Sequence, residues 1–422
     1  MNILYIHTHD TGRFIEPYGY KIDTPNLKKL ASRGTIFGNC FCAGPTCSPS
    51  RAALLTGMYP HMAGMTGLAH RGFSLNDYDK HLVNFLNRNN YNTILCGIQH
   101  EASSAEKIGY KTILNNEKED EMSERAESDI KNAERTAKLI TSYNSDKPFF
   151  ISAGFFSTHR AFPKTNINPD NCLPPPNLPN NQKTREDMAG YMTSAKIADD
   201  CVGIVLDSLN NSSFCDNTMV IFTTDHGIAF PYMKCTLYDG GTGVSLIVDY
   251  PDNPSRKKRI DSLISHVDIF PTICDICNLK KPDWLVGKSF LPVLEGKKKE
   301  INESVYSEIN YHSSYEPMRS IRTERYKYIK YFGDRKKLIP NHIDKGLSKD
   351  FVTYAGYEQV KKQAEELYDL HIDPNEKMNL ANLPDYIHIK MELSKKLLNN
   401  MKKYKDPVLN GVIACPDKSK II

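Results

Sequence analysis

Three short segments carry residues that could do chemistry together. Cys47 precedes a Pro-x-Arg step that ends at Arg51, and an apolar helical segment follows, so its side chain is expected near a helix N-terminus. That end of a helix carries free N–H groups and partial positive charge, which suit an anion. Asp10 and the pair Asp225 and His226 each follow an apolar, strand-like segment.

Carboxylates such as Asp10 and Asp225 hold a hard divalent ion such as calcium, and the imidazole of His226 widens the choice toward softer metals. Taken singly, these residues have ordinary structural roles. A lone cysteine is usually a buried thiol, and a lone histidine usually has a neighbouring partner. The chemical interpretation therefore requires that the three segments meet in the fold.

The elements that must position these residues alternate between strand and helix over about the first 290 residues. Four apolar segments end in polar residues, which is typical of a parallel α/β sheet with its ligand site at the carboxyl edge. Helices are expected at 25–33, 82–89, 188–209 and 268–277, with another that follows an acidic segment at 115–129 and reaches 139. The four polar segments are 7–13, 97–100, 157–160 and 223–227.

Beyond Gly296 the pattern changes to alternating strands at 304–309, 318–323 and 326–331, followed by a helix at 386–403. This predicts a small C-terminal α+β subdomain with an antiparallel sheet. We therefore expect one large domain over 1–300, which carries the candidate chemistry, and a smaller subdomain over 301–422. A Pro- and Asn-rich segment at 163–182 is expected to form a loop over the site.

Composition limits the classes of partner and the compartment. The chain has 422 residues, 40% of them hydrophobic, and a net charge of +4, so no nucleic-acid or membrane partner is expected. No apolar run approaches 18 residues, and no signal peptide precedes the first strand. A cytoplasmic protein with cysteines kept as thiols is the resulting expectation, and Cys274 and Cys277 are interpreted as core residues.

The segment from Cys47 to Gly57, with Cys-x-Pro-Ser-Arg followed by Ala-x-Leu-Leu-Thr-Gly, resembles the signature of type I sulfatases. This resemblance implies an alkaline-phosphatase-like α/β fold with a large, mixed but mostly parallel sheet flanked by helices. It also implies that a formylglycine-generating (sulfatase-maturating) enzyme converts Cys47 to formylglycine, whose hydrated aldehyde supplies the nucleophilic oxygen. Arg51 would brace that hydrate and the metal ligands.

Segments 2–10 and 222–227 resemble the two metal-binding segments of sulfatases, which implies one divalent ion, with calcium favoured. The first segment usually ends in two aspartates, whereas this chain has His9 in place of the first. Either His9 coordinates through a ring nitrogen or the ion has one ligand fewer, and we favour coordination. The expected metal ligands are His9, Asp10, Asp225 and His226.

His100, His159 and Lys234 match sulfatase positions by local context. The resemblance implies that His100 interacts with the formylglycine hydroxyls, that His159 and Lys234 bind the sulfuryl oxygens, and that His159 protonates the leaving group. A histidine suits proton transfer because its ordinary pKa lies near neutrality. The usual lysine two residues before His100 is replaced by Ile98, so one cation is missing.

The similarity extends through 287–296, 366–370, 373–376 and 379–381, and it is more particular to the heparan N-sulfatase (sulfamidase) branch at 64–68, 230–231 and 315–320. It implies a sulfated mono- or oligosaccharide substrate, with sulfate leaving from oxygen or nitrogen. His312 and Arg319 would contact the substrate or tie the two domains together. Two alternatives stay open: a phosphonate or phosphate ester hydrolase of the same superfamily, and an inactive sulfated-sugar-binding homologue.

Overall fold

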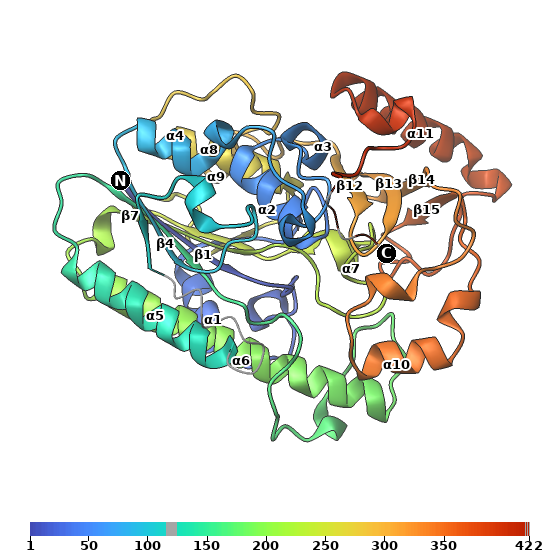
Figure 1. Ribbon diagram of the computed structural model, residues 1–422, viewed down its shortest axis with the longest axis horizontal. Helices are drawn as coiled ribbons and strands as arrows, with labels where there is room; N and C mark the ends of the chain where they lie inside the picture. Colours follow the sequence, from blue (N-terminus) through green and yellow to red (C-terminus); the bar gives the residue numbers. More distant parts are fainter. Residues whose placement is uncertain (115–124, 418, 420, 422) are drawn as a thin grey trace.

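A mostly parallel sheet forms the centre of the computed structural model, which describes residues 1–114, 125–417, 419 and 421 (Figure 1). Within these residues the sheet has eight strands in the order β10-β2-β9-β7-β1-β6-β4-β5. The middle strands β7, β1, β6, β4 and β5 run parallel, and β9 joins β7 in the antiparallel direction. The strands are β1 Asn2–Thr8, β2 Thr35–Phe37, β4 Asn92–Gly97, β5 Thr112–Ile113, β6 Phe149–Gly154, β7 Thr218–Thr224, β9 Leu246–Asp249 and β10 Lys258–Ile260.

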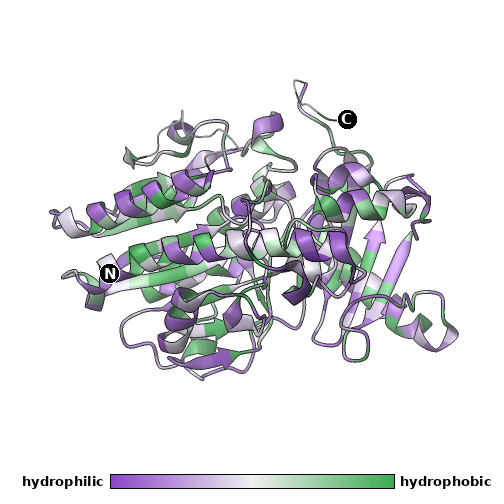
Figure 2. Ribbon diagram, turned by 90° about the horizontal axis from the view of Figure 1, so that it is seen from below, coloured by the Kyte–Doolittle hydropathy of each residue, from purple (hydrophilic) through white to green (hydrophobic). Residues whose placement is uncertain are grey.

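The central strand β1 is buried on both faces. Ile3 and Tyr5 pack into the core on one side of the sheet, and Leu4 and Ile6 pack into the core on the other side. Because successive side chains of a strand point to opposite faces, a continuous apolar segment is what a strand covered on both sides requires. Figure 2 shows the hydrophobic strands lying between layers of helices.

Helices cover both faces of the sheet, as the sequence predicted (Figure 1). The core on one face includes side chains of α1, α5 and α6, and the core on the other includes side chains of α2, α4 and α8. The helices are α1 Pro25–Arg33, α2 Cys47–Thr56, α4 Leu82–Arg88, α5 Arg125–Ser142, α6 Gln182–Asn210 and α8 Ile269–Ile276. The fold class predicted for the large domain is confirmed.

Helix α6 begins at Gln182, six residues earlier than its apolar spacing predicted. The Asn181 side chain accepts a hydrogen bond from the Thr184 backbone N–H, and the Thr184 hydroxyl oxygen accepts one from the Asn181 backbone N–H. This capping box fixes the N-terminus of the helix. The cap lies at the end of the Pro- and Asn-rich segment, where composition alone favours a loop. The acidic segment predicted at 115–129 falls largely outside the described residues.

The C-terminal part forms a four-stranded antiparallel sheet, as predicted, covered by helix α11. The strand β15 and helix α10 were not predicted from the sequence. These elements are β12 Val305–Tyr311, β13 Tyr315–Arg322, β14 Tyr326–Tyr331, α10 Leu347–Tyr354, β15 Glu365–Asp369 and α11 Ile387–Lys403; the remaining short elements are β3 Cys40–Phe41, α3 Pro60–Ala63, α7 Asp239–Thr242, β8 Gly243–Val244, β11 Ile264–Ser265 and α9 Leu291–Leu294.

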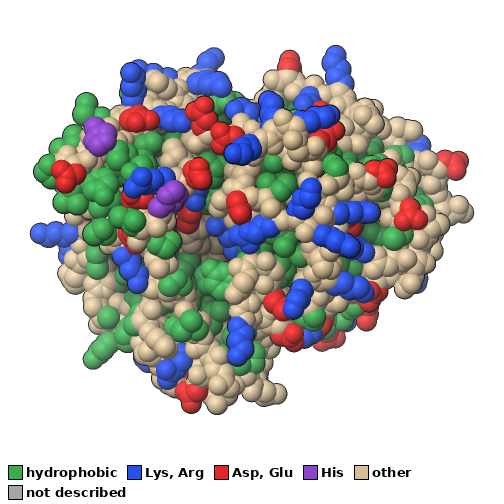
Figure 3. All heavy atoms as spheres, turned by 180° about the vertical axis from the view of Figure 1, so that it is seen from behind, with side chains coloured by type: hydrophobic (Ala, Val, Ile, Leu, Met, Phe, Trp, Pro, Cys, Tyr) green, Lys and Arg blue, Asp and Glu red, His purple; other side chains and the backbone are tan. Residues whose placement is uncertain are grey.

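The molecular surface agrees with the small net charge. Figure 3 shows one face on which Lys and Arg side chains are interspersed with Asp and Glu side chains. Among the described residues, none of the helices combines the length and the apolar character that crossing a membrane requires.

Candidate functional site

Cys47 is the first residue of α2 and is buried, with Thr46 before it in an extended conformation. The helix is buried along its whole length because it lies between the sheet and the C-terminal part of the chain. Its N-terminal N–H groups therefore face the interior near the carboxyl ends of β1 and β7. The predicted position of Cys47 at a helix N-terminus is confirmed, and it suits an anionic group.

The candidate metal ligands come together from the ends of two neighbouring strands. Asp10 follows β1, and Asp225 and His226 follow β7. One ligand atom from each of Asp10, Cys47, Asp225 and His226 lies within 4.8 Å of the others, and the same holds for His9, Asp10, Cys47 and His159. Asp10 has a left-handed backbone (φ 50°), and its N–H donates to Asp225 Oδ1 at 2.8 Å.

The chemistry of this cluster fits a divalent cation. Nδ1 of His226 is 2.9 Å from the Gly227 carbonyl, so Nδ1 carries a proton, and Nε2 is the atom that can bind a metal when the ring is neutral. That Nε2 atom is buried, has no hydrogen-bond partner among the described residues, and lies 3.2 Å from Asp10 Oδ1. His9 Nδ1 is 3.0 Å from Asp225 Oδ2. Asp10, Asp225 and His226 thus converge as cation ligands do, and His9 lies next to them.

Arg51 braces this cluster from the second turn of α2. Its guanidinium donates to Asp225 Oδ2 at 3.0 Å and to the Thr8 carbonyl at 2.9 Å. Its Nη1 lies 2.6 Å from His7 Nδ1, a contact that the sequence did not indicate. The side chain is almost fully buried, so it holds the ends of β1 and β7 against the start of α2.

His100, His159 and Lys234 surround the same point from three other loops. His100 Nδ1 is 2.9 Å from His9 Nε2. His159 Nδ1 lies 2.5 Å from the Arg160 carbonyl, which turns Nε2 toward Lys234, 3.5 Å from its Nζ. Lys234 Nζ also donates to Asp10 Oδ2 at 2.9 Å. All three predicted side chains therefore lie where they could act on a group bound next to Cys47.

Electrostatics at this site favour negative charge. Burial opposes ionisation, yet the charges of Lys234 and His9 hold the pKa of the unmodified Cys47 thiol well below its usual range. Burial likewise opposes the charge of Lys234, but the nearby carboxylates of Asp10 and Asp344 raise its pKa well above the usual value. Burial, with help from the charge of His9, lowers the pKa of His100 to about 3, so His100 is neutral at physiological pH.

Ile98, which stands where sulfatases usually carry a lysine, lines a cavity of about 480 Å³ next to His100. The described residues that line this cavity include Ser48, His70 and Gln99 but no lysine or arginine. The missing cation is therefore not replaced by another described residue in this cavity.

The two predicted substrate contacts have different environments. His312 is buried beside the site, and the charges of Lys234 and Asp344 act on it, although burial is the main cause that lowers its pKa to about 3. Arg319 is fully buried and donates to both carboxylate oxygens of Asp406, at 2.6 and 2.9 Å. It also donates to two carbonyls and to the Asn310 amide oxygen.

The assignment of Arg319 to substrate contact was therefore wrong, because its donors are all used inside the C-terminal part of the chain. Asp406 also accepts a hydrogen bond from the Tyr306 hydroxyl at 2.7 Å, and this hydroxyl oxygen lies 3.1 Å from Glu308 Oε2. Glu308 in turn binds His61 Nδ1 at 2.5 Å. The arginine thus supports a buried network that ends on the large domain. The motif that contains Arg319 indicated a position close to the substrate, but a motif cannot show the direction in which a side chain points.

Asp344 is a site residue that the sequence did not indicate. Its Oδ2 lies 2.8 Å from Lys234 Nζ, and its side chain is 24% exposed. It belongs to a loop between β14 and α10 that has no motif. Arg125, the first residue of α5, was also not indicated by the sequence and lies 3.3 Å from His159 Nδ1.

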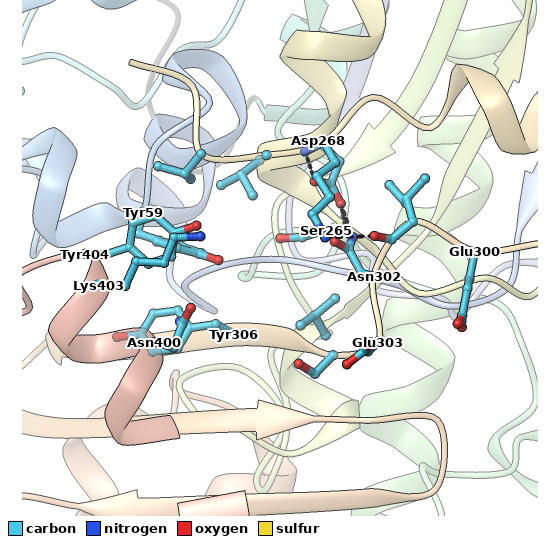
Figure 4. Close-up of a pocket in the computed structure, with 17 residues that line it drawn as sticks. Tyr59, Ser265, Asp268, Glu300, Asn302, Glu303, Tyr306, Asn400, Lys403 and Tyr404 are labelled. Carbon is cyan, nitrogen blue, oxygen red and sulfur yellow. Dashed lines mark hydrogen bonds between the residues drawn. The ribbon is translucent and has the colours of Figure 1, made fainter. Parts of the chain in front are cut away.

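A separate cavity of about 490 Å³ lies between the large domain and the C-terminal part (Figure 4). Tyr59 and Asp268 of the large domain line it together with Tyr306, Asn400 and Tyr404 of the C-terminal part. Asp268 accepts hydrogen bonds from the Ser265 and Lys288 backbones and from Asn302. None of the predicted site residues lines this cavity.

The carboxyl edge of the mostly parallel sheet thus gathers carboxylates, imidazoles and the Cys47 side chain in one buried site. The sequence profile of the sulfatase family matches residues 1–279, and that of the N-sulphoglucosamine sulphohydrolase C-terminal region matches residues 226–363. This chain belongs to the sulfatase family. Members of this family generally use a divalent metal and a formylglycine.

Two relatives illustrate the similarity in sequence. Human N-sulphoglucosamine sulphohydrolase is 28% identical, with 94% of this chain and 88% of that protein covered. An ulvan-active sulfatase of Formosa agariphila is 31% identical, with 94% of this chain and 78% of that protein covered.

Two solved structures share the fold. A complex with D-glucosamine-2-N,6-O-disulfate has a TM-score of 0.74 at 19% identity and covers 96% of this chain and 98% of that one. A phosphonate monoester hydrolase of Agrobacterium radiobacter has a TM-score of 0.75 at 18% identity and covers 99% and 98%.

Proposed function

We propose that this sulfatase removes sulfate, as an ester or as an N-sulfate, from a sulfated mono- or oligosaccharide. The observation that carries the proposal is the convergence of Cys47 with Asp10, Asp225 and His226, whose ligand atoms lie within 4.8 Å of one another. The human relative bears the name of an N-sulfoglucosamine hydrolase, and a structural neighbour was solved with a sulfated glucosamine. Both support a sulfated amino sugar as substrate.

We propose that one divalent ion is held by Asp10, Asp225, His226 and His9. Calcium is the expected ion because two carboxylates contribute, although the imidazoles also allow a transition-metal ion such as manganese. When bound, the ion would offset charge on the sulfuryl oxygens, and a formylglycine at position 47 would supply the nucleophilic oxygen. Conversion of Cys47 requires a formylglycine-generating enzyme, which is the protein partner that we propose.

In this proposal, the side chains around position 47 bind the sulfuryl group and transfer protons. Lys234 and His159 lie together on one side, where they can bind the sulfuryl oxygens, and His159 Nε2 can give a proton to the leaving atom. His100, neutral at physiological pH, can accept a proton from a hydroxyl group at position 47. Arg51 positions Asp225 and the start of α2.

The C-terminal residues 301–422 contribute to the substrate pocket in this proposal, next to a catalytic domain over 1–300. Support comes from His312 and Asp344, which approach Lys234 from the C-terminal side. The predicted cytoplasmic location stays a prediction from the sequence alone.

The direct test is sulfate release from glucosamine N-sulfate and from O-sulfated monosaccharides, measured on protein co-expressed with a maturating enzyme. Release from at least one of them supports the proposal. The similarity to a phosphonate monoester hydrolase favours a second candidate, a phosphonate or phosphate ester hydrolase. Faster hydrolysis of phenyl phosphonate or phosphate esters than of sulfate esters would favour that candidate.

The replacements His9 and Ile98 favour a third candidate, an inactive homologue that binds sulfated sugars. It predicts an unmodified thiol at position 47 in protein from the native host, together with retained sugar binding. A thiol in protein from a foreign host does not count for it unless a maturating enzyme was present.

A further inference from the structure

Asp344 places a carboxylate beside the cations that would bind a sulfuryl group. Lys234 lies between Asp344 and His159, because its Nζ atom is 2.8 Å from Asp344 Oδ2 and 3.5 Å from His159 Nε2. Lys234 already has a buried carboxylate partner in Asp10, at 2.9 Å. A second carboxylate at this position repels an anionic substrate and partly offsets the positive charge of Lys234. Because both effects weaken binding of a sulfuryl group, a specific role is needed to explain why the carboxylate is there.

The loop that carries Asp344 is held in place on both sides. His342 Nε2 lies 3.0 Å from Glu316 Oε2, and Lys349 Nζ donates to the Ile343 carbonyl at 2.6 Å. The Ser348 backbone donates to Asp187 on α6.

The same Asp187 carboxylate binds both terminal nitrogens of Arg160, at 2.6 Å each. Because Arg160 directly follows His159, the segment that carries the predicted proton donor and the loop that carries Asp344 share one anchor. Asp344 is therefore a fixed part of the pocket rather than a freely moving surface side chain.

The geometry points to Asp344 as a specificity-determining residue that pairs with the nitrogen of an N-sulfated amino sugar. This inference rests on the proposed function. As the S–N bond breaks, the sulfuryl group passes to the nucleophilic oxygen at position 47, and the nitrogen keeps the electron pair of the bond and leaves as the amine after taking one proton from His159. Because this proton reaches the nitrogen before the bond is fully broken, the nitrogen carries positive charge in the transition state, and the Asp344 carboxylate pairs with that charge.

An O-sulfated sugar leaves a neutral hydroxyl at the same place, which gains only an ordinary hydrogen bond. Asp344 thus favours departure from nitrogen over departure from oxygen. If Asp344 acted only by holding Lys234, its loss would affect both classes of substrate alike, because Lys234 contacts the sulfuryl group that they share.

The experiment compares Asp344→Asn with the wild type and with a control, Asp350→Asn, which removes an exposed carboxylate from the first turn of α10. For Asp344→Asn, kcat/KM on glucosamine N-sulfate should fall roughly 10- to 100-fold, the effect of one charge-assisted hydrogen bond. On glucose 6-sulfate it should stay within about threefold. Equal losses on both substrates, or no loss on the N-sulfate, would overturn the assignment.

A binding measurement that needs no turnover separates this inference from the proposed function. By titration calorimetry the wild type and Asp350→Asn should bind glucosamine at least about tenfold more tightly than glucose, and Asp344→Asn should lose that preference. Equal binding of both sugars by the wild type would overturn the role of Asp344 even if sulfate is released. Absence of sulfate release with an intact preference for glucosamine would instead refute the proposed function.

Discussion

Arg51 donates from Nη2 to Asp225 Oδ2 at 3.0 Å, and this ion pair joins the helix that begins at Cys47 to the end of β7. Both side chains are almost fully excluded from solvent. This ion pair therefore helps to hold the nucleophile position next to a candidate metal ligand.

Replacing Arg51 with Ala should lower the free energy of unfolding by about 3–5 kcal/mol, because the buried Asp225 carboxylate would lose its guanidinium partner. Chemical denaturation measures this, with Arg88→Ala as an exposed control that should change stability by no more than about 0.5 kcal/mol. If Arg51→Ala were as stable as the control, the ion pair would not brace the site.

Arg319 should matter for stability and not for substrate affinity. Arg319→Met removes the partner of buried Asp406, so we expect a loss of about 3–5 kcal/mol in unfolding free energy with KM unchanged. The double variant Arg319→Met/Asp406→Leu should recover part of this loss, since no charge is then left unpaired. A raised KM at unchanged stability would restore the original assignment to substrate contact.

The metal proposal predicts a shift in stability that does not depend on activity. A divalent ion at about 100 times its Kd should raise the free energy of unfolding by about 2.7 kcal/mol. His226→Ala should weaken binding of the ion about tenfold or more, while His388→Ala, an exposed histidine on α11, should leave it unchanged.

Calorimetric titration with Ca²⁺ and with Mn²⁺ measures the affinity and shows which ion binds more tightly. Equal affinity of the wild type and His226→Ala would exclude His226 as a ligand.

Stability should fall below neutral pH through His81, which lies far from the metal ligands in sequence and caps α4 by accepting from the Val83 backbone. Burial lowers the pKa of His81 to about 3. The unfolded chain binds a proton near pH 6.5, whereas the folded chain does so only near pH 3, so stability is lost as pH falls between these values.

From pH 7 to pH 5 this histidine alone should cost about 2 kcal/mol. His81→Asn keeps a capping oxygen but does not titrate, so urea unfolding of this variant should show a correspondingly smaller loss between the two pH values. An identical pH dependence in the wild type and the variant would show that His81 is not the group responsible.

The residues that follow buried strands could be predicted from the sequence, because the carboxyl ends of parallel strands must meet at one edge of the sheet. Asp10, Asp225 and His159 belong to this group, and Cys47 was identified by its motif. Asp344 could not be predicted, since it reaches the site from a loop that the antiparallel sheet and α10 place there.

Arg319 shows the opposite failure. Its motif correctly placed it in the C-terminal part, but the direction of its side chain depends on the buried partner Asp406, 87 residues further along the chain. Long-range ion pairs of this kind leave no periodic signal in a sequence.

The central claim is that an oxidised side chain at position 47 does the chemistry. Trypsin releases residues 34–51 as one peptide, and because Cys40 and Cys42 lie in it as well, fragment ions must assign the change to position 47. The decisive measurement is the rate of sulfate release plotted against the fraction of that peptide carrying an aldehyde in place of the Cys47 thiol, in preparations with different amounts of maturating enzyme. We expect a straight line through the origin; sulfate release at an undiminished rate by protein with an intact Cys47 thiol would contradict the claim.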